Sequence, residues 1–422
     1  MDPSPRTAYA ETALAAPETP PLTNNTRVDV AVIGGGFTGL STALHLAMRG
    51  VHVAVLEARE PGWGASGRNG GQVNPGLKHD PDQIERDFGP ELGRRMIALS
   101  GNAPNVVFDL IQRHQIACEA RQSGTIRAAA LNRDARAVRA AAEQWLHRGA
   151  PASLLGPSEL HAVTGADRYV CALLDRRGGQ LNPLSYARGL ARVAIQAGAS
   201  VHGNTRSLRV QRNGRAWQVR TPRASLHADY VVLATNGYTD ALWTGLQLSI
   251  VPVFSAIIAS EPLPDTIAAA ILPSRSVLYE VGHITTYYRI DLQNRLLMGG
   301  RSVQRDVRDV SDLRYLIRYA QRLWPALRGV RWTHAWSGQL ALTPDHYPHV
   351  HEPAPGILAC LGYNGRGVAM STAMGAQIAN RLLGGEIDMP VTTIRQIPFQ
   401  ALWRSAVQGR MIYGRIRDWL GL

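Results

Sequence analysis

The chain has 422 residues, 45% of them apolar, so it is longer than one small core requires and two interleaved domains are expected. Its three cysteines, Cys118, Cys171 and Cys360, lie far apart and form no CxxC pair, which argues against a disulfide framework or a zinc site and indicates a reducing cytoplasm. The formal charge of +13 comes almost wholly from arginine, since Lys78 is the only lysine, and no basic block with interleaved aromatics occurs, so nucleic acid is not an expected partner.

Residues 1–26 are rich in Pro, Ala and Thr and contain neither a basic n-region nor an apolar h-region. This composition is typical of a mobile, disordered tail rather than of a signal peptide. No apolar run reaches the length of a membrane span, so a cytoplasmic protein is expected.

A strand, a glycine turn, a helix and a second strand follow one another directly after this tail. The apolar run Val28–Ile33 leads into Gly34, Gly36 and Gly39 in GxGxxG spacing, and an amphipathic helix then precedes the second run, Val51–Leu56. This order is the fingerprint of a dinucleotide-binding unit. In it the first glycine permits the turn, the second lets the backbone approach a pyrophosphate, and the third lets the helix pack on the sheet.

The end of the second strand and the start of the helix complete this site. The helix offers free N–H groups and the positive end of its dipole to a phosphate. Glu57 ends the strand, where a carboxylate accepts hydrogen bonds from ribose hydroxyls and repels a 2′-phosphate, which argues against NADP. The motif alone does not distinguish FAD from NAD. The cofactor contacts predicted here are Gly34, Gly36, Phe37, Thr38, Gly39 and Glu57.

A second glycine-rich stretch, Glu60–Gly76, reads EPGWGASGRNGGQVNPG. Backbone that passes close to a flat ligand has this composition, and the alternative interpretation is a flexible surface loop. The cofactor contacts predicted in it are Ser66, Gly67, Arg68, Asn69 and Gln72.

The middle of the chain carries few chemical signals. Residues 81–146 are predicted to be mostly helical, and a further helix is expected to begin at Pro157–Leu160 with Ser158 as its N-cap. Two alternating segments, Ser207–Val210 and Ala216–Arg220, predict a β-hairpin.

A buried strand, Tyr230–Ala234, then ends in small residues at the carboxyl edge of a parallel sheet, where open α/β sheets bind ligands. The contacts predicted there are Thr235, Asn236 and Gly237. Residues 248–300 are richer in alternating strands, which indicates a separate antiparallel sheet, and a helix is predicted over Asp312–Trp324.

A third glycine turn follows the strand Ile357–Leu361 and runs into a helix of small residues, Ala369–Leu383. Strand, turn and helix N-terminus again build a site for an anion or a carbonyl. One nucleotide does not need two such turns, whereas an extended FAD does, with its phosphates at one and its isoalloxazine at the other. The predicted contacts are Gly362, Tyr363, Asn364, Gly365, Arg366, Gly367 and Val368.

The three glycine regions, with ATNGY between them, resemble the D-amino acid oxidase superfamily of FAD-dependent oxidoreductases over residues 28–383. Within it, GWGASGRNGGQ and GYNGRGVAMS are most similar to the gamma-glutamylputrescine oxidase branch, whose last motif usually reads GYSGHGVA. The resemblance implies an α/β fold, α+β overall, with a Rossmann-like FAD-binding domain and an inserted antiparallel-sheet substrate domain. The implied divisions are a tail at 1–26, the FAD domain at 27–80, 165–245 and 345–390, the substrate domain with helical segments at 81–164 and 246–344, and a basic amphipathic tail at 391–422.

The resemblance also implies the chemistry. A carbon next to nitrogen gives hydride to flavin N5, and the imine is hydrolysed in water. Backbone N–H groups of residues 365–368 are expected to stabilise negative charge at flavin N1 and O2. Arg366 stands where the branch usually has histidine, and it either strengthens that stabilisation or holds a substrate carboxylate.

Three departures from the related sarcosine oxidase bear on the cofactor and the acceptor. Ala369 and about Leu297 stand where that enzyme has lysines for substrate and for oxygen, so Arg301, Arg289 or a histidine would substitute, or the acceptor is a quinone rather than oxygen. Gly338 stands near the place of its flavin-linking cysteine, so FAD is expected to be non-covalent.

The implied substrate is a small amine or amino acid similar to gamma-glutamylputrescine. Tyr288 and Trp336 are proposed as aromatic walls and Arg301 as a charged anchor, which with Arg366 completes the predicted catalytic set. The alternatives are core aromatics and a solvated arginine at a strand end. His79, His334, His346, His349 and His351 have irregular spacing, so no metal site is predicted.

Other functions stay open at this point. A D-amino acid or N-methyl amino acid dehydrogenase that passes electrons to quinone fits the same motifs, and the basic amphipathic segment 403–422 either lies on a membrane surface or docks on its own domain. An NAD-dependent dehydrogenase leaves the second and third glycine regions unexplained. A flavoprotein without catalytic activity, or one that binds RNA, is the remaining alternative.

Overall fold

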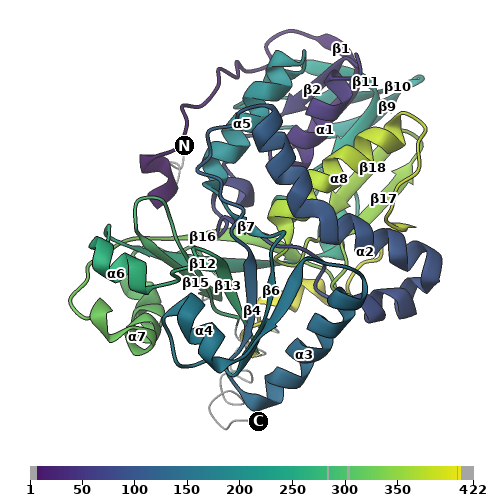
Figure 1. Cartoon of the computed structure of the whole chain (residues 1–422). Coiled ribbons are helices and arrows are strands. Elements are labelled where there is room, and N and C mark those ends of the chain that lie inside the picture. The colour runs from purple at the N-terminus through teal and green to yellow at the C-terminus, as the bar shows by residue number, and fades with distance from the viewer. Residues whose placement is uncertain (1–6, 283–284, 302–304, 406, 410–422) are drawn as a thin grey trace.

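The computed structural model describes residues 7–282, 285–301, 305–405 and 407–409. Two large sheets stand one above the other in Figure 1, and a short two-stranded sheet lies between them, formed by β3 (Gln72–Val73) and β7 (Gly179–Gln180). The chain crosses between the two large sheets several times, so each sheet is assembled from segments far apart in the sequence.

The first sheet has nine strands, in the order β19-β17-β18-β11-β1-β2-β8, with the β9–β10 hairpin paired to β11. Its centre is parallel: β1 pairs with β2 and β11, and β11 pairs with β18. The carboxyl ends of β1, β11 and β18 therefore meet at one edge, and each is followed by one of the predicted turns. The bounds are β1 (Thr26–Ile33), β2 (Val53–Leu56), β8 (Ser200–His202), β9 (Arg209–Asn213), β10 (Ala216–Arg220), β11 (Ser225–Leu233), β17 (His349–Ala354), β18 (Ile357–Leu361) and β19 (Val391–Thr392).

Helices rich in small residues cover the first sheet. α1 packs between α5 and α8, and α2 packs on α8. The close approach of α1 and α8 depends on Gly375, where a Cβ would lie 2.4 Å from the Cβ of Ser41. The bounds are α1 (Phe37–Ala47), α2 (Pro81–Arg113), α5 (Pro183–Gln196) and α8 (Gly367–Leu382).

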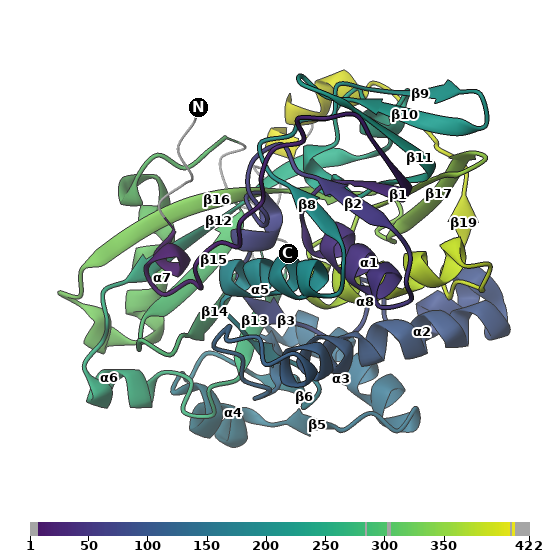
Figure 2. The same cartoon turned by 90° about the horizontal axis from the view of Figure 1, so that it is seen from above.

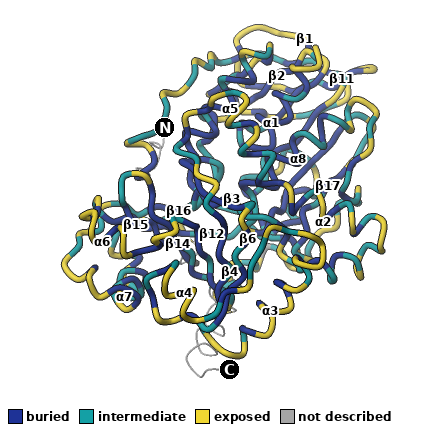
Figure 3. The backbone as a smooth tube through the Cα atoms, viewed as in Figure 1, coloured by how far each residue is buried: buried dark blue, intermediate teal, exposed yellow. Residues whose placement is uncertain are grey.

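The second sheet has eight strands, in the order β16-β12-β15-β14-β13-β4-β6-β5, all antiparallel neighbours except the parallel pair β13–β4. Its strands are β4 (Thr125–Ala129), β5 (Ala152–Leu155), β6 (Cys171–Asp175), β12 (Val251–Ser260), β13 (Val277–Val281), β14 (Tyr287–Ile290), β15 (Leu296–Arg301) and β16 (Trp332–Leu342). The helices beside it are α3 (Asn132–His147), α4 (Pro157–Thr164), α6 (Asp265–Ala270) and α7 (Arg314–Leu323). Figure 3 shows that the central strands of both sheets are buried while these helices are exposed on their outer sides.

The architecture confirms the predicted fold class, an α/β sheet with an antiparallel sheet inserted. The prediction that residues 81–146 are mostly helical is confirmed, since α2 and α3 cover most of them and the strand β4 lies between these helices. The predicted N-cap Ser158 was wrong, because the N-cap of α4 is Gly156. The helix predicted over Asp312–Trp324 begins as a 3-10 turn, Val310–Leu313, and continues as α7.

Three stretches lie elsewhere than the predicted divisions place them. α2, predicted in the substrate domain, packs on α8 because its apolar face joins the core under the first sheet. β6, predicted in the FAD domain, pairs with β4 and β5 of the second sheet. β19, predicted in the C-terminal tail, pairs with β17, whereas residues 410–422 lie outside the described residues.

The N-terminal segment also differs from its prediction as a disordered tail. From residue 7 onward it has a defined course, and Figure 2 shows it passing from β1 along the outside of α5 to the side of β15 and β16. Residues 8–11 form a short 3-10 helix in which Tyr9 is only 3% exposed. Tertiary contacts order this segment despite its Pro- and Ala-rich composition. Among the described helices, none has the length and apolar character that crossing a membrane requires.

Candidate active site

A cavity of about 690 Å³ lies between the two sheets. Its lining includes the three glycine regions at the edge of the first sheet and residues of β4, β12, β13, β14, β15 and β16 of the second sheet. The predicted cofactor motifs therefore converge on one space, although they are spread over more than 300 residues of sequence.

The first glycine turn has the close approaches that its motif requires. Gly34 has φ +111°, and a Cβ on Gly39 would lie 2.0 Å from the carbonyl oxygen of Gly34, so α1 can pack only if residue 39 is glycine. Gly34, Gly36, Phe37 and Thr38 line the cavity, whereas Gly39 lies behind it. The turn thus presents bare backbone and the N-terminus of α1 to a ligand.

Glu57 lies at the end of β2 and lines the cavity. Its Oε2 accepts a hydrogen bond from the N–H of Gly35 at 2.7 Å, and its Oε1 accepts one from the N–H of Arg59 at 2.9 Å. These bonds hold the carboxylate beside the first turn. Burial raises the pKa of Glu57 above its ordinary value, against the lowering effect of the two backbone donors.

The raised pKa of Glu57 predicts a pH dependence of cofactor binding. A carboxylate accepts two ribose hydrogen bonds more strongly than a neutral carboxyl group does, so affinity is complete above this pKa and falls as the pH is lowered through it. We expect a fluorescence-quenching titration with FAD to show this loss in the wild-type protein and a flatter, weaker profile in Glu57→Gln. An unchanged pH profile in that variant would assign the titration to another group.

The second glycine region curves under the cavity and is tied down by its side chains. Ser66 accepts a hydrogen bond from the N–H of Phe37 at 3.0 Å, which joins the loop to α1. Gln72 donates from Nε2 to the carbonyl oxygens of Leu278 and Tyr288, which joins it to the second sheet. Ser66, Arg68, Asn69 and Gln72 line the cavity, whereas Gly67 does not. Gly67 instead permits close packing within the loop, since a Cβ there would lie 2.3 Å from the carbonyl oxygen of Gly62.

Arg68 is a buried cation at the cavity wall. Its Nε donates to the carbonyl oxygen of Trp63 at 2.7 Å, and its guanidinium carbon lies 4.1 Å from the centre of the Trp63 ring. Its Nη2 is buried without a hydrogen-bond partner, and burial lowers the pKa of Arg68. Arg68 is a lining residue of the cavity, so a group bound there is a source of an acceptor for this buried donor.

The turns after β11 and β18 are joined to each other. Asn236, in the left-handed region with φ 42°, accepts a hydrogen bond at Oδ1 from the N–H of Gly362 at 2.9 Å. Tyr363 bonds through its hydroxyl to Thr38 Oγ1 at 2.6 Å, which also joins the third turn to the first. The residues of these turns that line the cavity are Thr235, Asn236, Gly237, Tyr363, Asn364, Gly365, Arg366, Gly367 and Val368, and only Gly362 of the predicted set lies behind it.

These features fit an extended dinucleotide. Two helix N-termini, those of α1 and α8, face one cavity, and bare glycine backbone lines both ends. Two buried donors, Arg68 Nη2 and Arg366 Nη1, have no hydrogen-bond partner among the described residues. Such a set suits the phosphates at the first turn and the polar edge of a flavin ring at the third.

Comparison with known proteins identifies the family. Residues 29–381 match the DAO model of FAD-dependent oxidoreductases. The chain is a DAO-family FAD-dependent oxidoreductase. It is similar to the gamma-glutamylputrescine oxidoreductase of Escherichia coli (strain K12), with 32% identity over 415 residues that cover 95% of each protein.

Solved structures agree on the fold of this oxidoreductase. Glycine oxidase from Geobacillus kaustophilus superposes with a TM-score of 0.72 at 22% identity, covering 88% of this chain and 99% of that one. L-proline dehydrogenase from P. horikoshii superposes with a TM-score of 0.73 at 20% identity, covering 87% and 96%. FAD is the cofactor, as predicted, because the chain belongs to a family of FAD-dependent oxidoreductases. The three cysteines are buried and none lines the cavity, which favours non-covalent binding.

The other end of the cavity carries an aromatic and cationic wall. Tyr279 of β13 and Arg127 of β4 are register partners on the second sheet, and Tyr287 lies beside them on β14. Arg366 donates from Nη2 to the Tyr279 hydroxyl at 2.7 Å, with its guanidinium carbon 4.5 Å from the ring centre. Lys78 lies at the exposed part of the same lining.

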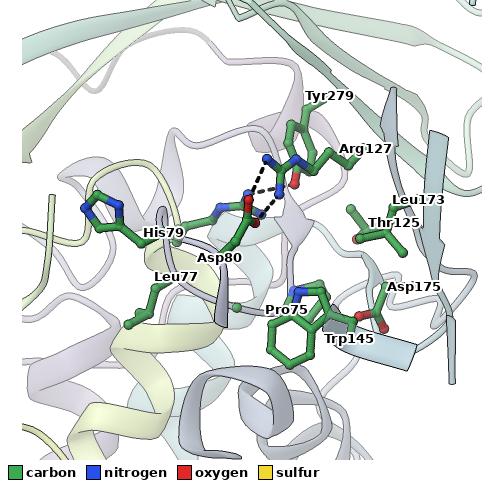
Figure 4. A pocket seen from close by; sticks show the side chains of 12 residues that line it. Pro75, Leu77, His79, Asp80, Thr125, Arg127, Trp145, Leu173, Asp175 and Tyr279 are labelled. Atoms are coloured by element: carbon green, nitrogen blue, oxygen red, sulfur yellow. Dashed lines mark hydrogen bonds and ion pairs between the residues drawn. The ribbon is translucent and has the colours of Figure 1, made fainter. Parts of the chain in front are cut away.

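A small side cavity of about 20 Å³ adjoins this wall and shares Arg127, Tyr279 and Arg366 with it. Figure 4 shows Arg127 and Asp80 facing each other there beside Tyr279, joined by an ion pair of 2.5 Å. Arg127 is therefore neutralised within the protein. Among the described residues, no carboxylate forms an ion pair with Arg366.

Two predicted substrate residues do not line the cavity. Tyr288 is fully buried in the opposite face of the second sheet, where its hydroxyl lies 2.6 Å from that of Tyr169 and its ring packs on Trp324. Trp336 lies behind the second glycine region and donates from Nε1 to the carbonyl oxygen of Arg68. The prediction that these two rings form the cavity wall was wrong. Tyr288 faces the opposite side of its strand from Tyr287, because alternate residues of a strand face opposite sides. Trp336 shares its strand face with Gly338 and Leu340, but the second glycine region covers it. The backbone of Arg301 pairs with Ser255, and its side chain is outside what is described.

Sequence reasoning also missed residues that line the cavity. Tyr279, Arg127 and Lys78 belong to segments without a motif, so no local signal marked them. Tyr287 directly precedes the predicted Tyr288, and the two side chains point to opposite faces of β14. Only the pairing of this strand determines which of them faces the cavity. Leu297 and Ala369, the positions compared above with the lysines of sarcosine oxidase, are buried and do not line the cavity. Lys78, the only lysine in the sequence, does line it.

The phase of β14 predicts opposite effects for its two tyrosines. Tyr288→Phe removes a buried hydroxyl contact, so we expect the free energy of unfolding to fall by about 1 kcal/mol while kcat/KM stays unchanged. Tyr287→Ala removes cavity wall, so we expect kcat/KM to fall at least about tenfold. Urea unfolding and steady-state kinetics of both variants check this, and a kinetic defect in Tyr288→Phe alone would reverse the assignment.

Proposed function

We propose that this oxidoreductase oxidises the carbon–nitrogen bond of a small amine that also carries a carboxylate, as gamma-glutamylputrescine does. The observation that carries the proposal is Arg366, a cation in the cavity lining with one guanidinium nitrogen on Tyr279 and another buried without a partner. The E. coli relative named for gamma-glutamylputrescine, 32% identical, supports the same substrate class.

Electrostatics favours an anion beside Arg366. The residue is the N-cap of α8, so its charge adds to the positive end of the helix dipole. Arg127 is satisfied by Asp80, whereas Arg366 has a hydroxyl rather than a carboxylate as its partner. A substrate carboxylate supplies the missing charge and accepts from the planar fork of the guanidinium.

The residues of the same wall favour the neutral form of a bound amine, which is the form that can be oxidised. Amines are protonated at neutral pH, and only the neutral form has a carbon that readily gives up hydride. Arg366 and Lys78 at the lining disfavour a further positive charge, which lowers the pKa of a bound amine. Tyr279 and Tyr287 offer aromatic surface to an alkyl chain between the two polar ends.

FAD, when bound, supplies the two-electron acceptor that takes hydride from the carbon next to nitrogen. The amine thereby becomes an imine after loss of a proton, and water converts the imine into an aldehyde and ammonia. Gly365, Gly367 and Val368 line the cavity at the start of α8, and their backbone N–H groups would stabilise negative charge on a bound flavin. The N–H of Arg366 already donates to the carbonyl oxygen of Tyr363. Lys78 is the one lysine available for oxygen chemistry, and a quinone is the alternative acceptor.

An anaerobic absorbance titration of the purified yellow protein tests the proposal. The panel is gamma-glutamylputrescine, putrescine, sarcosine, glycine, proline and D-amino acids. We expect gamma-glutamylputrescine to bleach the flavin and putrescine, which has no carboxylate, to do so far less readily. Rapid recovery of colour in air would identify an oxidase, and slow recovery a dehydrogenase that uses quinone. Bleaching by no member of the panel would overturn the proposal.

A further inference from the structure

We propose that the N-terminal segment, residues 7–15, is a clasp that completes the FAD site, with Tyr9 as a positioning residue for the second glycine region. This segment has no recognisable motif, and its contacts appear only in the folded protein. The proposal rests on FAD as the cofactor and does not depend on the identity of the amine.

The side of the second glycine region away from the cavity is held at three successive carbonyl groups. Trp336 Nε1 donates to the carbonyl oxygen of Arg68 at 2.9 Å, the Tyr9 hydroxyl donates to that of Asn69 at 2.7 Å, and Arg289 Nε donates to that of Gly70 at 2.7 Å. Three consecutive peptide groups are thus fixed in orientation. On its opposite side, the same stretch of the loop lines the cavity with Arg68, Asn69 and Gly70.

The three donors form one packed cluster. The rings of Tyr9 and Trp336 meet edge to face with centroids 5.1 Å apart, and the guanidinium carbon of Arg289 lies 5.7 Å from the Tyr9 ring centre. Each of the three residues is at most 3% exposed. Trp336 and Arg289 belong to strands of the second sheet, so Tyr9 alone is delivered by a segment outside both sheets.

The segment is anchored to the second sheet at Glu11. Its Oε2 lies 2.5 Å from Arg295 Nη2 and its Oε1 lies 3.0 Å from His334 Nε2. Arg295 Nη1 also donates to the carbonyl oxygen of Ala8 at 3.2 Å. The contacts of Ala8 and Glu11 flank Tyr9 in the sequence. They fix the position of its ring behind the second glycine region.

The other end of the segment is anchored to the first sheet and its helix α5. The N–H of Leu14 donates to Ser185 Oγ at 3.1 Å, and Arg188 Nη1 donates to the carbonyl oxygen of Leu14 at 2.8 Å. Beyond this segment, the N–H of Leu22 donates to Thr205 Oγ1 at 3.1 Å, in the loop after β8 of the first sheet. The segment therefore spans the junction between the two sheets directly behind the loop that faces the cofactor (Figure 2).

Loss of the Tyr9 hydroxyl leaves the buried carbonyl of Asn69 without its donor, and the loop can relax toward the cavity. We expect Tyr9→Phe to raise the dissociation constant for FAD about five- to tenfold and to change the visible circular dichroism of the bound flavin. Deletion of residues 1–14 should weaken FAD binding further. Both readouts are measured without any amine, so they stand apart from the proposed substrate.

Tyr288→Phe is the matched control, because it also deletes one buried tyrosine hydroxyl from the second sheet, and that hydroxyl contacts no part of the loop. The backbone carbonyl of Tyr288, which accepts from Gln72, is unchanged by the substitution. It should cost similar stability and leave FAD affinity and the visible spectrum as in the wild type. Equal FAD affinity and identical visible circular dichroism in Tyr9→Phe and wild type would overturn the proposal. An equal loss of affinity in Tyr288→Phe would overturn it as well, since the effect would then follow general stability. If the deletion variant does not fold, Tyr9→Phe decides alone.

Discussion

Gly36→Ala should yield a folded protein that binds FAD about 100-fold more weakly than the wild type, a loss of ~2.7 kcal/mol. Gly36 lines the cavity with its bare Cα, and a methyl group there occupies the space into which a pyrophosphate must come. Its backbone is extended, with φ −89°, so alanine introduces no conformational strain. The added Cβ would lie 2.9 Å from Ser66 Oγ, which must shift and weaken its hydrogen bond from the N–H of Phe37.

The measurement is an equilibrium titration of apoprotein with FAD, with thermal unfolding of the apoprotein as the test of folding. Gly156→Ala is the matched control, because Gly156 also precedes a helix with an extended backbone but lies far from the cavity lining. FAD affinity within twofold of the wild type in Gly36→Ala would show that the phosphates do not approach this turn.

Arg366→Gln should lower kcat/KM for a carboxylate-bearing amine about 100-fold, or ~2.7 kcal/mol, because a charge-assisted bidentate contact is replaced by a neutral amide. The loss should appear mainly in KM, and an amine without a carboxylate should lose far less. FAD should still bind, since the first turn and Glu57 are untouched. Steady-state kinetics with both amines, after FAD saturation, measures the difference.

Arg381→Gln is the control for this experiment. Arg381 lies in the last turn of the same helix, α8, and pairs with Glu352 at the surface at 2.7 Å, so its loss should leave kcat/KM unchanged. An equal loss with both amines, together with a lower reduction potential of the flavin, would contradict the assignment to the substrate carboxylate. It would instead place the Arg366 charge on the flavin N1–O2 edge.

Much of the cofactor site could be predicted because its requirements are local. A strand that must turn sharply into a helix beside a phosphate needs glycine at particular positions, and those positions are visible as spacing. Gly34 and Gly39 illustrate this, since a Cβ on them would lie 2.8 Å and 2.0 Å from backbone carbonyl oxygens. Of the predicted contacts, only Gly39, Gly67 and Gly362 lie behind the lining, and there glycine serves close packing instead.

The substrate end could not be predicted in the same way. Arg127 and Tyr279 are 152 residues apart and become neighbours only through the parallel pairing of β4 with β13. Tyr287 and Tyr288 have the same side chain in adjacent positions, and which of them faces the cavity depends on the pairing of β14 with β13 and β15. Pairing register is a tertiary property, so the alternation of one short strand does not specify it.

The sequence by itself determined the cofactor end of this protein, because backbone turns, helix starts and the acid after β2 impose local demands that appear as residue types at set spacings. Only the tertiary structure decided the substrate wall and the course of the N-terminal segment. The wall depends on strand register between distant segments, and the segment is ordered by contacts of Tyr9 and Glu11 with elements far along the chain. The composition of a segment indicates whether it would be disordered when free. In the folded protein, burial and hydrogen bonding offset the conformational entropy that is lost when the segment becomes ordered.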